Sequence, residues 1–319
     1  MIRVLVTGAT GFVGRQLCDL LSRRNYRVRA ALRTDRSLPL GVAETVIVGD
    51  IGAGTTWTRA LDGIDCVVHC AALAHIIGDQ SRLSNQYMET NARGTENLVR
   101  ACADARVRRF VYLSSIKVNG EKTDGLPFSP LDTPNPSDAY AISKWMAETH
   151  VLKVAGVSSM ETAIVRPPLV YGPEVRANFL RLMRWVDNRL PLPLGSAKNS
   201  RSLVSVWNLC DLIERLLRDS IPKNAVFMVS DGEDLSTREL ICRMGLAMQR
   251  PVRLIPVPVS LLAVLATLIG RKPEFDRLCG TLTVDISSTC SELGWRPPIL
   301  VDDGLARTAR WFYSRNTEA

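Results

Sequence analysis

Short runs of β-branched and apolar residues alternate with stretches of helical apolar spacing through the first half of the chain. Runs of four to six such residues predict strands, and apolar residues recurring every three or four positions predict helices. The predicted strands are 2–6, 28–32, 45–48, 66–69, 110–113 and 163–165, and predicted helices lie at 14–24, 85–105 and 140–154. This alternation predicts an α/β fold in which a parallel sheet carries helices on both faces.

The pattern changes after Arg166, where prolines interrupt the chain and the helices are separated by longer loops. We therefore predict two parts. Residues 1–166 form a doubly wound nucleotide-binding domain, and residues 167–319 form a smaller α/β part that binds substrate. The chain can cross back between them.

Composition and charge limit the classes of protein to which the chain can belong. Hydrophobic residues make up 46% of the chain and charged residues 23%, which excludes a disordered or fibrous protein. The net charge of +8 suits an anionic partner, such as a cofactor phosphate, a nucleotide, nucleic acid or a lipid surface. Arginines at 23, 24, 27, 29, 33 and 36 are a candidate basic patch. We expect them to serve cofactor phosphate and solvent, and we expect no nucleic-acid partner.

Cysteine and histidine usage argues for a cytoplasmic protein without a metal site. The eight cysteines include no CxxC pair, which favours free thiols in a reducing compartment. The three histidines have no neighbours at metal-ligand spacing. The N-terminus shows no secretory leader. The apolar run 257–269 is shorter than the roughly 20 residues that span a bilayer, so it predicts a buried or surface-docked helix.

Three glycines connect the first predicted strand to the first predicted helix. They are Gly8, Gly11 and Gly14, and Thr10, Phe12 and Val13 lie between them. Glycine permits the tight turn and the close approach of a pyrophosphate, while the helix N-terminus offers N–H donors to the anion. The segment predicts dinucleotide binding.

A second motif places Tyr140 and Lys144 four residues apart, on one face of a helix. A neighbouring ammonium favours the phenolate, which brings tyrosine closer to acid–base chemistry at neutral pH. Ser114 and Ser115 follow the predicted strand 110–113, at the sheet edge where open α/β sheets bind ligands.

Together these motifs resemble the extended short-chain dehydrogenase/reductase family, in its nucleotide-sugar epimerase/dehydratase/reductase branch, which has a Rossmann fold. The resemblance covers essentially the whole chain. It includes Asp50 and Ile51, similar to an adenine-contacting pair, and Ala71 and Ala72 beside the cofactor channel. It also includes Asn91, whose counterpart supports the active site. The 25-residue spacing to Tyr140 and the five to Gly120 select Ser115 over Ser114 as the catalytic match.

The resemblance implies a role for each catalytic residue. Tyr140 exchanges a proton with a sugar oxygen, Ser115 hydrogen-bonds that oxygen, and Lys144 lowers the tyrosine pKa while holding the nicotinamide ribose. The implied cofactor-binding residues are Gly8, Thr10, Gly11, Phe12, Val13, Gly14, Arg33, Asp50, Ile51, Ala71, Ala72, Tyr140 and Lys144. Relatives often pair two helices per subunit, so a homodimer is expected.

The end of the second predicted strand bears on cofactor choice. Leu32 stands where NAD-preferring relatives carry an acid that bonds the ribose 2′-hydroxyl, and Arg33 and Arg36 follow. The missing carboxylate removes repulsion of a 2′-phosphate, which a guanidinium can hold. We predict NADP, with NAD as the alternative.

The second half of the chain resembles the UDP-sugar site of the family. Asn178 and Arg201 match positions that contact the nucleotide diphosphate, and Arg277 matches a further contact more loosely. The implied substrate-binding residues are His75, Ser115, Lys117, Asn178, Arg201 and Arg277.

Three functions remain open. The first is reduction of the C4 keto group of a UDP-4-keto-6-deoxy-N-acetylhexosamine, for bacterial O-antigen or capsule sugars. The second is a UDP-hexose 4-epimerase that retains NAD. The third is an NADP-dependent reductase of apolar carbonyls. A chain that binds cofactor without turnover is a further alternative from outside the enzymes.

Overall fold

The computed structural model describes residues 1–35, 41–74 and 80–317. Its centre is a seven-stranded sheet in the order β3-β2-β1-β4-β5-β6-β9, and every pair of neighbours is parallel. The strands are β1 (Arg3–Thr7), β2 (Arg27–Leu32), β3 (Glu44–Ile47), β4 (Cys66–His69), β5 (Arg109–Leu113), β6 (Glu161–Arg166) and β9 (Ala225–Met228). This order confirms the predicted Rossmann fold class.

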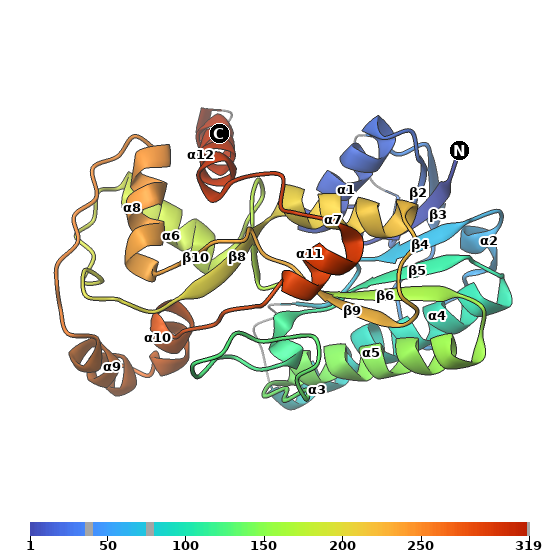
Figure 1. The fold of residues 1–319 in the computed structure, drawn as a ribbon, viewed down its shortest axis with the longest axis horizontal. Helices are drawn as coiled ribbons and strands as arrows, with labels where there is room; N and C mark the ends of the chain where they lie inside the picture. The colour runs from blue at the N-terminus through green and yellow to red at the C-terminus, as the bar shows by residue number, and fades with distance from the viewer. Residues whose placement is uncertain (36–40, 75–79, 318–319) are drawn as a thin grey trace.

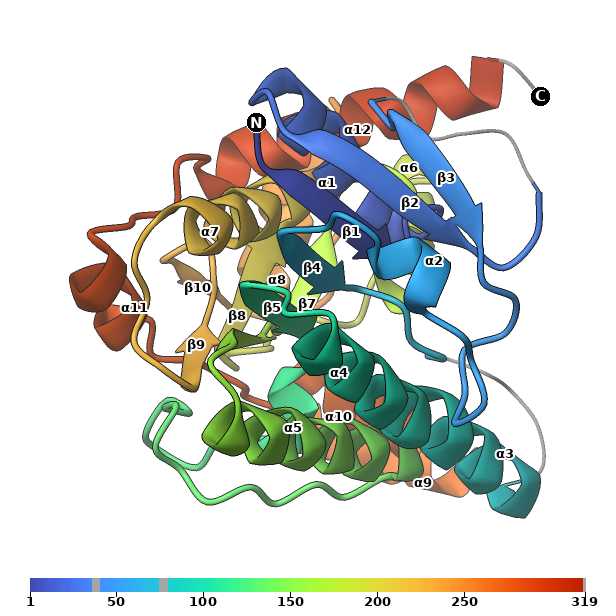
Figure 2. The ribbon, with the colours of Figure 1, turned by 90° about the vertical axis from the view of Figure 1, so that its right-hand side faces the viewer.

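Helices cover both faces of this sheet (Figure 2). One face carries α1 (Phe12–Arg23) and α7 (Val206–Arg218), and the other carries α4 (Gly94–Asp104) and α5 (Ala139–Val157). Side chains alternate along β1, so that Val4 and Val6 pack with α1 and α7 while Leu5 packs in the α4 and α5 core. Burial on both faces explains the continuous apolar run Val4 to Val6 of β1.

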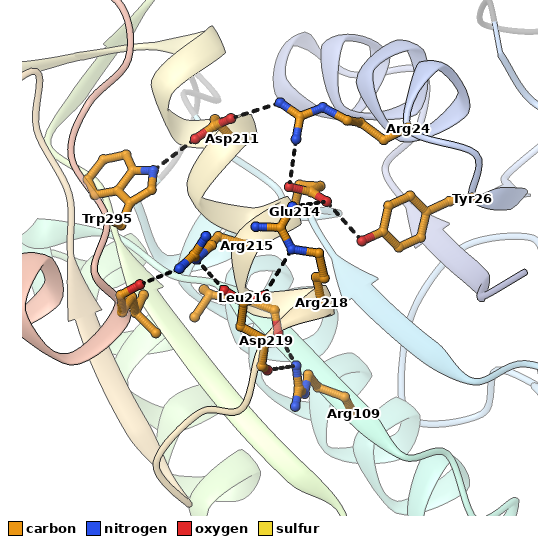
Figure 3. Close-up of polar contacts among 11 residues, drawn as sticks. Arg24, Tyr26, Arg109, Asp211, Glu214, Arg215, Leu216, Arg218, Asp219 and Trp295 are labelled. Carbon is orange, nitrogen blue, oxygen red and sulfur yellow. Dashed lines mark hydrogen bonds and ion pairs between the residues drawn. The ribbon is translucent and has the colours of Figure 1, made fainter.

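Polar contacts fasten α7 to the first βα unit (Figure 3). The buried Glu214 carboxylate accepts hydrogen bonds from Tyr26 Oη at 3.0 Å and from Arg24 at 3.3 Å. Arg24 also reaches Asp211, which accepts a bond from Trp295 Nε1 at 2.9 Å. The C-terminal segment is thereby joined to the first half of the chain.

A smaller part lies beside the main sheet, at the left of Figure 1. Its sheet has the order β10-β8-β7, with a core of its own between that sheet and the surrounding helices. Its elements are β7 (Leu169–Tyr171), α6 (Ala177–Asp187), β8 (Arg201–Ser205), β10 (Asp234–Leu235), α8 (Thr237–Ala247), α9 (Val259–Leu268), α10 (Lys272–Cys279) and α12 (Val301–Thr317).

The chain does not remain in this part after residue 166. Both α7 and β9 return to the main sheet, and α11 (Ser287–Leu293) packs beside β9. The division of the chain into two parts at residue 166 therefore stays a prediction. The structure contains the expected crossings back to the main sheet, at α7 and β9 before β10 and at α11 after it.

The predicted helix 85–105 differs from the structure. It consists of α3 (Gln80–Tyr87), a π-helical segment η1 (Met88–Arg93) and α4. Gly94 begins α4 close to Ile51, where a Cβ would lie 2.6 Å from the Ile51 side chain. The remaining short elements are α2 (Thr58–Leu61) and the 3₁₀ turn η2 (Ile116–Val118).

Candidate active site

The glycine turn between β1 and α1 is shaped for a phosphate group. Gly8 has a φ of +67°, and a Cβ there would lie 2.7 Å from the backbone nitrogen of Ala71. A Cβ on Gly14 would lie 2.1 Å from the Gly8 carbonyl oxygen. Gly11 precedes α1 without a side-chain cap, so no side chain satisfies the first N–H groups of this helix at its N-cap. Such a turn fits a dinucleotide pyrophosphate.

The turn rests against the end of β4. The Thr7 hydroxyl lies 2.6 Å from His69 Nδ1 and accepts a hydrogen bond from the Ala71 backbone N–H. His69 Nε2 lies 3.0 Å from the Thr95 hydroxyl. Burial and the nearby Lys144 lower the His69 pKa to about 3, so the ring is neutral and serves as a buried link between strand and helix.

A pocket of about 570 Å³ opens beyond the carboxyl end of β3, and the predicted Asp50 and Ile51 both line it. Asn97 of α4 shapes its wall by donating hydrogen bonds to the carbonyl oxygens of Gly52, Ala53 and Thr55. Arg33 follows β2 at the neighbouring strand end, with its guanidinium 3.7 Å from the Asp50 carboxylate. The pocket, Arg33 and the glycine turn together fit an extended dinucleotide.

Ser115 and Tyr140 come together where β5 and α5 meet. The Ser115 hydroxyl caps η2 and shares a hydrogen bond with the Tyr140 phenol. Tyr140 lies in the first turn of α5, which begins because the Asp138 carboxylate accepts the Ala141 N–H at 2.7 Å. The ring of Tyr87 stands edge-on to Tyr140 with centroids 5.9 Å apart.

Burial governs the electrostatics of Tyr140 and Lys144. Desolvation raises the pKa of Tyr140 to about 12, although the Ser115 hydrogen bond opposes the rise. Burial lowers the pKa of Lys144 to about 7, against the attraction of Glu148. The Lys144 ammonium donates to the Leu113 carbonyl oxygen at 2.6 Å. Burial therefore dominates in this arrangement and the phenol keeps its proton at neutral pH, while the expectation that Lys144 lowers the tyrosine pKa stays a prediction.

A buried ion pair lies behind these groups. The Arg166 guanidinium holds both oxygens of the Glu148 carboxylate and donates to Asn119 Oδ1 at 3.0 Å. The Ser114 hydroxyl donates to the same carboxylate. Ser114 is thus committed to this pair, which agrees with the choice of Ser115 for the site.

Asn91 fixes the loop that follows β4. Its side-chain oxygen accepts the Leu73 N–H at 2.8 Å, and its amide donates to the Leu73 carbonyl and to the Ser143 hydroxyl, each at 3.0 Å. Ser143 in turn donates to the Tyr140 carbonyl oxygen at 2.7 Å. The asparagine therefore connects the stretch containing Ala71 and Ala72 to the helix that carries Tyr140.

The structure brings only some of the predicted substrate-binding residues close together. Lys117 forms ion pairs with Asp138 at 2.5 Å and Glu121 at 2.8 Å, so protein carboxylates engage its ammonium, and its role in binding substrate stays a prediction. Arg277 reaches the same Glu121 at 3.9 Å from α10. Arg277 therefore joins the cluster of ion pairs formed by Lys117, Glu121 and Asp138.

The two predicted diphosphate anchors lie on different elements. Arg201 begins β8, where it donates to the Gly280 carbonyl oxygen at 2.9 Å and burial lowers the pKa of its guanidinium. Asn178 is exposed in the first turn of α6, and no hydrogen bond joins it to Arg201 among residues 1–35, 41–74 and 80–317. His75 lies outside the described residues.

Comparison with known proteins gives the family. Residues 4–230 match the NAD dependent epimerase/dehydratase family. The chain belongs to this family. The expected resemblance to extended short-chain dehydrogenases/reductases is thereby confirmed, and with it the classification of the chain as an enzyme of that family.

The relatives of this epimerase/dehydratase family member have names that specify different substrates. The chain is 43% identical over 98% of its length to a UDP-glucose 4-epimerase of Vibrio cholerae, of which it covers 96%. It is 32% identical over 74% of its length to a 3-beta-hydroxysteroid dehydrogenase of Mycolicibacterium neoaurum, of which it covers 68%. Its fold matches MoeE5 in complex with UDP-glucose and NAD, with a TM-score of 0.79 and 26% identity over 99% of this chain and 100% of that one.

Three residues in the site of this family member were not identified from the sequence. Glu148 lies one turn beyond Lys144 on α5, Asn97 lies on α4, and Tyr87 packs on Tyr140. The only signal for Glu148 is its place eight residues after Tyr140, which puts both on one helix face. Asn97 contacts a loop, and Tyr87 contacts the ring of Tyr140. Both contacts depend on tertiary packing, which the spacing of residues along the sequence does not reveal.

Proposed function

We propose that the chain reduces the C4 keto group of a UDP-4-keto-6-deoxy-N-acetylhexosamine, a step in making bacterial surface-polysaccharide sugars. The observation that carries the proposal is the Tyr140 phenol, which holds its proton at neutral pH beside the Ser115 hydroxyl. Reduction of a ketone requires a proton donor at the oxygen, and a protonated phenol next to a second hydroxyl supplies one.

Each residue then has a defined task. Ser115 and Tyr140 hydrogen-bond the keto oxygen, and Tyr140 donates its proton as negative charge develops there. A bound nicotinamide supplies the hydride. Lys144, whose pKa is about 7, holds the ribose and keeps a positive charge close enough to favour the phenolate left by proton transfer.

The cofactor is NADP or NAD, held by the glycine turn and the pocket at Asp50. We favour NADP because Leu32 ends β2 without a carboxylate and Arg33 is exposed beside that end. The MoeE5 structure contains NAD, so the comparison leaves NAD as the alternative. Dissociation constants for NADPH and NADH decide between them. Arg33→Ala should remove an NADPH preference of about ten- to a hundredfold, whereas equal constants in the unmodified protein contradict it.

The UDP moiety is proposed to bind Arg201 and Asn178, with Arg277 as a further contact. Arginine offers a paired, charge-assisted contact to phosphate oxygens. Titration with UDP in the presence of NADP⁺ tests this without knowledge of the sugar. Arg201→Ala should weaken UDP binding by about tenfold or more, while Arg181→Ala, an exposed arginine on α6, should leave it unchanged.

The second candidate is a UDP-hexose 4-epimerase, which the 43% identical Vibrio cholerae relative favours. One experiment separates the two. Stoichiometric oxidation of NADPH by the 4-keto sugar supports the reductase. Interconversion of UDP-glucose and UDP-galactose without net cofactor consumption supports the epimerase and overturns the reductase. If UDP does not bind at millimolar concentration, both fail, and the apolar-carbonyl reductase favoured by the steroid dehydrogenase relative takes their place.

A further inference from the structure

The helix α9 presents an apolar stripe to solvent. Leu261, Val264, Leu265 and Leu268 recur at helical spacing and are 51%, 56%, 48% and 77% exposed. Ile269 continues the stripe at the helix end, 68% exposed. We call these five residues the α9 stripe. Contiguous exposed apolar patches of this kind mark interaction sites on soluble proteins.

The opposite side of α9 accounts for its packing on the protein. Leu262 packs against the core of the smaller part, and Ala266 is buried. The helix contacts α10, and the two lie side by side at the lower left of Figure 1. The α9 stripe is thus not needed for the contacts that hold the helix in the fold, and its apolar character calls for another partner.

The chain segment that contains α9 carries charges of a single sign, although α10 beside it contains Glu274 and Asp276. From Arg250 to Pro273 the chain contains four basic residues and no aspartate or glutamate. Arg253 precedes the helix, and Arg271 and Lys272 follow it, all three exposed. Arg250 is paired with Asp187, and Lys272 lies 3.1 Å from Asp276, so Arg253 and Arg271 are the principal contributors to the positive field. An apolar stripe flanked by cations complements an anionic lipid headgroup layer.

We propose that α9 docks the protein on the surface of an anionic bilayer, lying parallel to it with the α9 stripe among the outer acyl carbons. Ten residues make a helix of about 15 Å, which suits an interfacial position. Among the described residues, no helix is long and apolar enough to cross a membrane. The docking is therefore peripheral and reversible.

Docking in this way places the bilayer near the substrate side of the molecule. Helix α10 follows α9 directly, and its Arg277 reaches Glu121, which is paired with Lys117. The membrane-facing helix is accordingly separated from this cluster of ion pairs by a single helix. This inference does not depend on the proposed reaction, since binding to lipid is measured without substrate or cofactor.

Sedimentation with vesicles tests the proposal. The full chain should sediment with vesicles of phosphatidylglycerol and phosphatidylcholine in equal parts, and much less with phosphatidylcholine alone. The double variant L265E/L268E should lower the partition coefficient by more than about tenfold. The double variant R253Q/R271Q should lower it by up to about thirtyfold at low salt and by little at high salt, because salt screens the same attraction.

A matched control is available on a neighbouring helix. Leu246 of α8 is 79% exposed, so Leu246→Glu makes the same chemical change at a comparable surface position outside the α9 stripe. It should bind vesicles like the unmodified protein. Cofactor binding by every variant confirms that it is folded.

Three results would overturn the proposal. The first is that the unmodified protein stays in the supernatant with anionic vesicles, and the second is that L246E loses binding as much as L265E/L268E. The third is that L265E/L268E converts a dimer to a monomer in lipid-free sedimentation. The last outcome would make a second copy of the chain the partner of the α9 stripe.

Discussion

Replacement of Asn91 by alanine should cost both stability and activity. The side chain is buried and makes three hydrogen bonds, two to the Leu73 backbone and one to the Ser143 hydroxyl. At about 1 kcal/mol each, the lost bonds amount to about 3 kcal/mol. Leu73 is partly exposed, so water recovers some of its two bonds and the expected loss of unfolding free energy is about 2–3 kcal/mol.

The effect on activity follows from what the asparagine joins. Ser143 adjoins Lys144 in α5 and donates to the Tyr140 carbonyl, so a loosened Asn91 contact shifts the helix that carries both groups. A displacement of about 1 Å in such a site costs about a hundredfold in rate. Urea unfolding measures the loss of unfolding free energy, and turnover with a competent sugar nucleotide measures the loss of rate.

Two further variants sharpen this test. Asn85→Ala makes the same change at an exposed position on α3 and should cost less than about 0.5 kcal/mol. Asn91→Asp keeps the size of the side chain and the bond from the Leu73 N–H, but loses the two donated bonds. If N91D is as stable as the unmodified protein, or if N91A unfolds like N85A, the three hydrogen bonds do not hold the site together.

Other predictions rest on single groups. Tyr140→Phe should lower turnover by about 100- to 10,000-fold while the cofactor dissociation constant is kept, and activity within tenfold of the parent would assign proton transfer elsewhere. Because burial lowers the Lys144 pKa from its ordinary value of 10.5 to about 7, the unfolded chain binds the extra proton between these values. This lysine should therefore make stability rise with pH across that window, and Lys144→Met should flatten the rise in unfolding experiments. Glu214→Ala should cost about 2–3 kcal/mol in urea unfolding, since the buried carboxylate serves Tyr26 and Arg24, whereas Glu233→Ala, at an exposed ion pair, should cost under about 1 kcal/mol.

The elements that the sequence predicts correctly are those with strong local patterns. Six strands of the main sheet are predicted from their β-branched runs, and all of them except the edge strand β3 are largely buried on both faces. The seventh, β9, escaped because Ala225–Met228 is short and lies in the half of the chain where prolines and loops obscure periodicity. The glycine turn could also be predicted from the sequence. Backbone contacts within the turn and with Ala71 require glycine at positions 8 and 14.

The π-helical segment η1 could not be predicted in the same way. One extra residue in a turn shifts the apolar pattern so little that 85–105 still appears as one helix. Its consequence is local, since η1 contains Asn91 and so helps to position the side chain that holds Leu73. Likewise, the Tyr140 pKa depends on burial, and the spacing of Tyr140 and Lys144 states only that they share a helix face.

Helix α5 explains why the site could be located from its residues but its chemistry could not. Ser143, Lys144 and Glu148 form a polar face that is buried, while Ile142 and Trp145 on another face are exposed. This departs from the usual amphipathic pattern, in which polar residues face water, although Ala147 and Val151 are buried on the same helix. The helix therefore places an ionisable stripe against the sheet, where low polarity lowers the Lys144 pKa and holds the proton on Tyr140. A pattern of residue types identifies the stripe, but only the packing of α5 against β5 and β6 determines which protonation states it adopts.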